Sequence, residues 1–194
     1  MIAFVRGNFA IKTPARIVVD VNGVGYELNI SLNTYSAIGN KDNGQLFTYL
    51  HITENAQTLF GFADLIEKEL FMQLISVSGV GASTARMMLS GMRPEEITRA
   101  IIQGNTKQLE GIKGIGKKSA ERLIVELRDK LSKQSLEVGI SGFNQPQIDV
   151  DAINALISLG IGRVMAEQAV KKIMQAEPNN ISLEDIIKQA LKNL

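Results

Sequence analysis

The feature that most constrains the fold is a repeat in the middle of the chain. Residues 74–85 (LISVSGVGASTA) and residues 109–120 (LEGIKGIGKKSA) share one pattern, in which an aliphatic-rich stretch leads into two glycines around one aliphatic residue. The two triplets are Gly79-Val80-Gly81 and Gly114-Ile115-Gly116. This spacing predicts that a helix ends, the chain turns sharply, and a second helix begins directly after the second glycine. Two copies in register therefore predict two helix-hairpin-helix motifs.

The predicted hairpins carry groups that can hold a phosphate. Glycine lets another molecule approach the main chain closely, and the first amides of a helix are unpaired donors at the positive end of its dipole. After the second hairpin, Lys117, Lys118 and Arg122 add positive charge, whereas the first copy offers Ser83 and Arg86. Because phosphate contacts carry no base information, we expect binding that is nearly independent of base sequence. The predicted contacts to the DNA backbone are Gly79, Val80, Gly81, Ser83, Gly114, Ile115, Gly116, Lys117, Lys118 and Arg122.

Two other glycine-rich stretches imitate known motifs but fit them poorly. Residues 111–117 (GIKGIGK) match the front of an ATPase phosphate-binding loop, but Lys118 stands where a Ser or Thr would hold Mg²⁺. ATP binding is therefore not expected. Residues 159–162 (LGIG) imitate a third hairpin, but Ser158 replaces the aliphatic residue of the other copies and no basic cluster follows. We interpret this stretch as a packing bend between two helices.

The first third of the chain has the pattern of a small β-barrel. Runs rich in Ile, Val, Phe, Tyr and Thr occupy residues 2–11, 16–30 and 45–62, with a loop and at most one helical turn between the last two. Asn22-Gly23 predicts a hairpin turn because both residues tolerate positive φ. About five short strands favour an antiparallel barrel of the OB type, since closure leaves no exposed strand edge.

The rest of the chain changes to helical periodicity. Asp64 and Glu67 form a predicted capping box, and Pro94 opens a helix that ends at Gly104. A long helix is expected from about Lys117 to Leu131.

Beyond this helix the helical periodicity of apolar residues is interrupted by one segment and then resumes. Ser, Gly, Gln, Asn and Pro dominate residues 132–148, which favours a flexible linker. Three short helices are predicted after it, the last with a capping box at Ser182 and Asp185. The expected fold is α+β and multidomain: an OB-fold barrel over residues 1–63, tandem helix-hairpin-helix motifs over 64–131, the linker, and a three-helix domain over 149–194.

The composition limits the chemistry that the chain can perform. It has no Cys and a single His, His51, which excludes disulfides, thiolate metal sites and Cys nucleophiles and leaves little for general-base catalysis. A net charge of +1 indicates that a polyanion would bind a local patch rather than a generally basic surface. No apolar run approaches the ~20 residues of a membrane span, and no signal or transit peptide is recognisable. We therefore expect an intracellular, cytoplasmic protein without a metal or cofactor, and a non-catalytic function is favoured.

The order of these segments resembles that of the RuvA family of bacterial Holliday-junction-binding subunits, on the stretches MIAFVRG, NGVGYEL, GVG…SGM and above all GIGKKSAERLIVEL. The resemblance covers the whole chain. It implies a homotetramer or an octamer that holds a four-way DNA junction open and roughly square-planar, in homologous recombination, DNA repair and the SOS response to DNA damage. It also implies a non-catalytic subunit that engages the hexameric AAA+ motor RuvB, whose ATP hydrolysis drives branch migration, before RuvC resolves the junction.

The resemblance assigns roles to two further sets of residues. The family projects two adjacent carboxylates, an acidic pin, at the junction centre. Here Glu54 keeps one acid and Asn55 replaces the other, so weaker repulsion of phosphates is expected. The tail is implied to dock on RuvB, and Leu156, Leu159 and Ile161 are the predicted docking residues, with packing in the core as the alternative.

The sequence leaves two other classes of function open. DNA glycosylases also contain helix-hairpin-helix elements, but they need a catalytic Asp or Lys beside a base-flipping pocket. Asp129 follows the second hairpin on a helix patterned for packing. A protein-interaction module would use the hairpins only as helix corners, and it would show no salt-dependent affinity for DNA.

Overall fold

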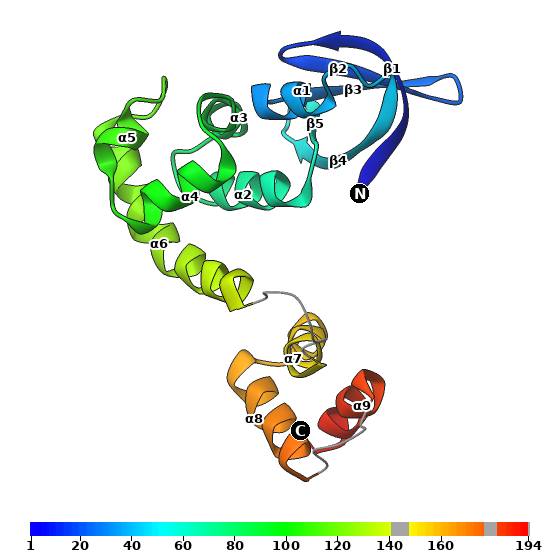
Figure 1. The fold of residues 1–194 in the computed structure, drawn as a ribbon, viewed down its shortest axis with the longest axis vertical. Coiled ribbons are helices and arrows are strands. Elements are labelled where there is room, and N and C mark those ends of the chain that lie inside the picture. The colour runs from blue at the N-terminus through cyan, green and yellow to red at the C-terminus, as the bar shows by residue number, and fades with distance from the viewer. Residues whose placement is uncertain (141–147, 177–181, 194) are drawn as a thin grey trace. The chain divides into compact units, whose positions relative to one another are not determined.

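The computed structural model describes residues 1–140, 148–176 and 182–193 of the chain (Figure 1). The chain divides into two compact units, Met1–Ile140 and Ser141–Leu194. The first unit combines the strands with helices, and the second contains helices.

A closed five-stranded barrel begins the first unit. Its strands are β1 (Phe4–Thr13), β2 (Arg16–Val21), β3 (Val24–Ile30), β4 (Asn43–Ile52) and β5 (Gln57–Phe62), paired in the order β1-β2-β3-β5-β4. The pairs are antiparallel except β3 with β5, which run parallel. The predicted barrel is confirmed. Its one parallel pair is formed by strands that are distant in sequence, so alternation within each strand did not reveal it.

The turn predicted at Asn22-Gly23 joins β2 to β3. Asn22 has φ 50° and Gly23 has φ 89°, the left-handed conformations that a two-residue hairpin turn demands. The Gly23 amide also donates to Asp20 Oδ1 at 2.7 Å. Local sequence therefore fixes the register of these two strands.

A short helix, α1 (Leu32–Ile38), follows β3 in place of the predicted loop. Ser31 caps it, since Ser31 Oγ accepts a hydrogen bond from the Thr34 amide at 3.0 Å. Ile38, at its other end, is buried in the barrel core with Ile17 and Leu28. The segment is thus part of the packed structure rather than a surface connection.

The helical part of the first unit follows β5 directly. Its helices are α2 (Leu65–Ile75), α3 (Ala82–Gly91), α4 (Pro94–Ile102), α5 (Thr106–Glu110) and α6 (Lys117–Ile140). Asp64 caps α2 as predicted, with Oδ1 accepting from the Glu67 amide at 2.8 Å. The Glu67 half of the predicted capping box is wrong, because its carboxylate instead accepts hydrogen bonds from the hydroxyls of Ser31 and Thr34.

The barrel has its own interior core, and a second hydrophobic cluster joins its β5 strand to the helices. Phe71 of α2 is fully buried, and its ring centroid lies 5.0 Å from those of Phe60 and Phe62 on β5 and 5.6 Å from that of Tyr49 on β4. The same cluster continues through Leu74, Val77, Leu89 and Leu123. The barrel is therefore packed against the helices that follow it through the aromatic side chains of β4 and β5.

The long helix α6 ends later than predicted. The sequence placed its end near Leu131, whereas the helix continues to Ile140, into the segment predicted as a linker. Residues 132–138 contain no Gly or Pro, so nothing in the local sequence stops the helix there. The remainder of that segment, residues 141–147, lies outside the described residues.

The second unit packs three helices around a small core. They are α7 (Ile148–Ser158), α8 (Arg163–Ala176) and α9 (Leu183–Asn193). Leu156, Val170 and Ile186, one from each helix, are buried together. The Ser182 half of the predicted capping box is confirmed, because Ser182 Oγ accepts from the Asp185 amide at 3.2 Å. Asp185 Oδ2 accepts from the Ser182 hydroxyl at 2.7 Å, where a capping box would have it accept from the Ser182 amide.

Candidate nucleic-acid interface

The first hairpin joins α2 to α3 as the glycine spacing predicts. Gly79 has φ 88°, and the amide of Val80 donates to the Val77 carbonyl at 3.0 Å, which closes the turn. The Val80 side chain is buried in the core of the helical part. α3 then begins directly after Gly81, whose carbonyl accepts its first helical hydrogen bond from the Ala85 amide at 2.9 Å.

The second hairpin repeats this geometry between α5 and α6. Gly114 has φ 95°, and the Ile115 amide donates to the Ile112 carbonyl at 3.0 Å. The Ile115 side chain is buried, and Ala120 donates to the Gly116 carbonyl at 3.0 Å. The matching dihedral angles and hydrogen bonds show that the sequence repeat is also a structural repeat.

The two glycines of each hairpin are needed for different reasons. Gly79 and Gly114 have positive φ, a conformation that costs other residues energy. Gly81 has φ −82° and ψ 165°, which any residue adopts, and a Cβ built there meets no atom within 4 Å; a Cβ at Gly116 also meets none. Since the protein itself leaves room for a side chain at Gly81 and Gly116, their bare backbone favours the approach of another molecule.

The helix starts after the hairpins present unpaired main-chain donors. No side chain caps the N-terminus of α3, and the amides of Ala82, Ser83 and Thr84 precede the first helical hydrogen bond. In α6 the equivalent amides belong to Lys117, Lys118 and Ser119. Such amides, at the positive end of a helix dipole, can bind a phosphate.

The predicted cations have different surroundings in the structure. Lys117 and Lys118 are exposed in the first turn of α6. Arg122 is also exposed, but its Nη1 donates to the Ser78 carbonyl at 3.1 Å, so it links the second motif to the first hairpin. Arg86 is directed away from the hairpin, because its Nη1 donates to Asn29 Oδ1 at 2.7 Å and to the Ala15 carbonyl at 3.2 Å in the barrel. The suggested contribution of Arg86 to phosphate binding therefore has no support from its position.

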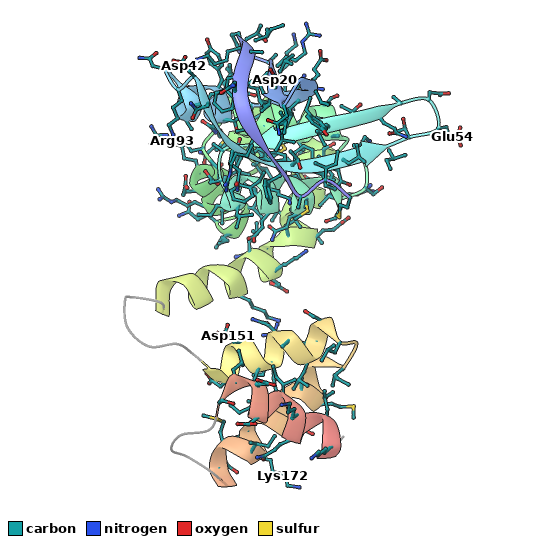
Figure 2. The ribbon with its side chains drawn as sticks, turned by 90° about the vertical axis from the view of Figure 1, so that its right-hand side faces the viewer. Asp20, Asp42, Glu54, Arg93, Asp151 and Lys172 are labelled. Atoms are coloured by element: carbon teal, nitrogen blue, oxygen red, sulfur yellow. The ribbon has the colours of Figure 1, made fainter. Side chains whose placement is uncertain are left out.

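The residues assigned to the pin lie at the tip of the β4–β5 hairpin. Thr53 and Ala56 close the turn, with the Thr53 amide donating to the Ala56 carbonyl at 2.9 Å. Glu54 and Asn55 are exposed between them. Figure 2 shows Glu54 at the end of this hairpin, where it projects beyond the rest of the barrel. One carboxylate is thus held out by the barrel, with an amide beside it.

The bend between α7 and α8 shares part of the hairpin geometry. Gly160 has φ 92°, and the Ala166 amide donates to the Gly162 carbonyl at 3.0 Å. The exposed side chains around it are apolar, however: Leu159 is 61% exposed, Val164 67% and Met165 52%. We call these three residues the apolar corner of the second unit.

The predicted docking residues divide between this corner and the core. Leu159 belongs to the apolar corner, Ile161 is half-buried, and Leu156 is completely buried among the three helices. Val164 and Met165 were not among the predicted docking residues. Their position in the first turn of α8, where the other hairpins have polar residues, was the available signal.

Other kinds of site find little support in the residues that the structure describes. Among these residues no group of three or more His, Cys, Asp and Glu side chains is arranged to hold a metal ion. No described helix combines the length and apolar character needed to cross a membrane. Asp129, considered above as a glycosylase-like acid, is exposed on α6.

Comparison with known proteins agrees with this geometry. Residues 1–61 match the model of the RuvA N-terminal domain, residues 71–129 that of a SAM-like helix-hairpin-helix tandem, and residues 150–194 that of the RuvA C-terminal domain. Proteins named Holliday junction branch migration complex subunit RuvA are similar over their whole length. The one from Flavobacterium psychrophilum is 46% identical over 100% of both chains, and the one from Cytophaga hutchinsonii is 44% identical over 99% of both. The relative from Amoebophilus asiaticus is 42% identical over 99% of this chain and 100% of its own. The three matched models follow the order of the barrel, the paired hairpins and the three-helix unit, and the relatives cover the whole chain. The chain therefore belongs to the RuvA family.

Proposed function

We propose that this chain is a structure-specific, sequence-independent subunit that binds Holliday junctions and holds them open for branch migration. The observation that carries the proposal is the pair of hairpins with matching geometry, each opening a helix whose first amides are available to a phosphate. Curated relatives over the whole chain bear the name of a Holliday junction branch migration complex subunit. The hairpin geometry favours binding of the DNA backbone over base recognition.

The two hairpins would act as one grip on a DNA arm. Phosphates along a strand are regularly spaced, so two anion sites on one rigid unit can hold two positions of a backbone together. Arg122 stabilises this arrangement by joining α6 to the Ser78 carbonyl of the first hairpin. Lys117 and Lys118 add two full positive charges beside the partial positive charges of the amides in the second hairpin. The side chains of Val80 and Ile115 are buried, so their part in DNA binding would come from the main chain.

Self-association would match the protein to a junction with four arms. We infer a homotetramer or an octamer, in which each subunit of a tetramer takes one arm. Large apolar side chains on α2 support an interface between subunits: Leu65 is 49% exposed and Ile66 63%. Ile66 also lines a cavity of about 470 Å³ between α2 and α4. Exposed apolar surface of this kind is typical of protein contact sites.

The pin would act at the centre of the junction. Unit charges a few ångströms apart interact by several kcal/mol at an effective dielectric constant of about 20, so a carboxylate held among phosphates repels the DNA strands. Glu54 supplies that charge, while Asn55 supplies an uncharged amide. A tetramer of this chain would thus present one acid per subunit, and we expect a milder separation of strands than two acids would give.

The second unit would recruit the motor. We infer that the RuvB hexamer docks on the apolar corner, Leu159, Val164 and Met165, because these side chains are exposed while Leu156 is committed to the core. ATP hydrolysis would belong to RuvB and junction cleavage to RuvC in the same complex. In this assembly the chain contributes DNA geometry and contacts, without catalytic residues of its own.

A comparison of two DNA substrates tests the proposal. We expect nanomolar binding to a four-way junction and far weaker binding to linear duplex of the same base composition. The junction affinity should fall steeply as salt rises, because phosphate contacts release counterions. A gel-shift titration at several salt concentrations measures both. Equal affinity for the two DNAs would refute junction recognition, and an affinity that does not depend on salt would favour a protein-interaction module.

A further inference from the structure

The direction of α3 determines where the first hairpin can hold a phosphate. The unpaired amides of Ala82, Ser83 and Thr84 point along the helix axis from its N-terminus, so a tilt of the helix moves the anion site. The other end of α3 therefore matters for DNA binding, although it lies away from the hairpin.

The barrel holds that other end through a set of hydrogen bonds. Asn33 Nδ2 on α1 donates to the Leu89 carbonyl at 2.6 Å and to the Met92 carbonyl at 2.9 Å, where α3 ends. The Leu32 amide donates to Ser90 Oγ at 3.1 Å. Figure 1 shows α1 beside α3 at this boundary. Helix-terminal carbonyls lack partners within their own helix, so Asn33 satisfies groups that would otherwise be unpaired.

A second set of hydrogen bonds joins the barrel to α3 one turn nearer the start of the helix. Arg86 Nη1 reaches Asn29 Oδ1 and the Ala15 carbonyl, both in the barrel. The barrel also carries the pin, with Glu54 at the tip of β4 and β5. The same body thus fixes the direction of α3 and the position of the pin.

We propose that Asn33 is a positioning residue for junction recognition, because its two hydrogen bonds set the direction of α3 and thereby the placement of the first hairpin relative to the pin. The inference rests on the proposed function. A linear duplex needs only the hairpins, whereas a junction must meet the hairpins on its arms and the pin at its centre. Loosening the barrel–α3 boundary therefore lowers the preference for a junction more than the affinity for DNA in general.

The binding test compares Asn33→Ala with a control that weakens the barrel elsewhere. Thr48→Val removes the hydrogen bond from Thr48 Oγ1 to the Ile2 carbonyl, 2.7 Å long and confined to the barrel. We expect Asn33→Ala to weaken junction binding about tenfold, because a loosened α3 must be ordered again when the junction binds, at a cost no greater than the two lost hydrogen bonds supplied. Duplex binding should fall by a smaller factor, and Thr48→Val should leave both affinities unchanged. Arg86→Gln is the second variant, with an effect in the same direction.

A distance measurement tests the positioning itself. The chain has no Cys, so spin labels at Asn55→Cys and Ser83→Cys report only the separation of the pin and the first hairpin. Labelled chains are diluted into unlabelled chains, so that each assembly carries one labelled pair. We expect double electron–electron resonance spectroscopy to give a broader distribution of the distance between the two labels in Asn33→Ala than in the chain with Asn33 or in Thr48→Val.

The outcomes separate this inference from the function on which it rests. If the unaltered chain does not prefer junctions to duplex, the proposed function fails and this inference fails with it. If the unaltered chain prefers junctions and both Asn33→Ala and Arg86→Gln keep that preference with a narrow distance distribution, only the positioning role is overturned.

Discussion

Lys117 and Lys118 are the residues on which the charge of the second hairpin depends. They occupy the first turn of α6, directly after Gly116, and both are exposed. Replacing both by Glu should weaken junction binding about 100-fold, because each charge-assisted hydrogen bond is worth about 1.5–3 kcal/mol and 1.4 kcal/mol is a factor of ten. A salt-dependent gel shift measures the loss.

The same helix offers a matched control. Lys130 and Lys133 are exposed on α6 several turns beyond the hairpin, so Lys130→Glu with Lys133→Glu makes an identical change of net charge. This double variant should bind the junction within about threefold of the unaltered chain, since surface charges far from the DNA are screened by salt. Equal losses in the two double variants would mean that overall charge, and not the second hairpin, drives binding.

Glu67 makes stability depend on pH. Burial raises the pKa of its carboxyl above the ordinary value of 4.5, although hydroxyl hydrogen bonds from Ser31 and Thr34 and an amide hydrogen bond partly oppose the shift; Asp64 adds to the increase. Between the unfolded and folded pKa values the folded state binds more protons, so stability falls as pH rises from about 4.5 to the folded value.

Glu67→Gln should remove this part of the pH dependence. We subtract the free energy of unfolding of the unaltered chain from that of the Gln variant. This difference should increase as pH rises above about 4.5 and should become constant above the folded pKa of Glu67. Urea unfolding at several pH values measures the difference. A difference that is the same at every pH would show that Glu67 keeps an ordinary pKa in the folded protein.

At the scale of elements, Gly81 leaves the first amides of α3 without a side-chain cap, which makes them available to a ligand but makes the helix less stable. Ser is a better N-cap than Gly, and Gly81 has space for a side chain. Gly81→Ser should raise the free energy of unfolding by about 0.5 kcal/mol while it weakens DNA binding about tenfold, because the new hydroxyl occupies an amide that the phosphate needs. Thermal unfolding and a junction titration measure the two effects.

The other glycine of the same hairpin gives the contrasting result. Gly79 has φ 88°, so Gly79→Ala should lower the free energy of unfolding by about 1–2 kcal/mol. Stability and DNA affinity would then fall together, whereas in Gly81→Ser they move in opposite directions. If Gly81→Ser bound the junction normally, the amides of α3 would not be the anion site.

Elements were predictable where their signals are local. The Asn22-Gly23 turn and the Asp64 and Ser182 caps are set by neighbours within three residues, and the hairpins by glycine spacing. The partners of Glu67 were not predictable, because Ser31 and Thr34 lie 36 and 33 residues away and are brought close only by folding. Arg86 was misjudged for the same reason. The end of α6 was missed because its Ser and Gln content suggested a linker, while no residue there breaks a helix.

At the scale of the whole molecule, the two units should be separable in function. Removing residues 141–194 deletes the apolar corner and leaves the unit Met1–Ile140, which contains both hairpins and the pin. The shortened chain should bind the junction with unchanged affinity and should fail to stimulate the RuvB ATPase. A gel shift and an ATPase assay with added RuvB measure the two properties. Loss of junction binding would contradict the assignment of DNA contacts to the first unit.

The Phe71 packing described above has a consequence for how such a chain can be dissected or recombined. Phe60 and Phe62 belong to the barrel by sequence, yet their rings rest on a side chain from α2. A fragment that ends at residue 63 would expose these aromatic side chains to water and would be prone to aggregation. For protein engineers, the smallest portable module therefore contains strands and hairpins together.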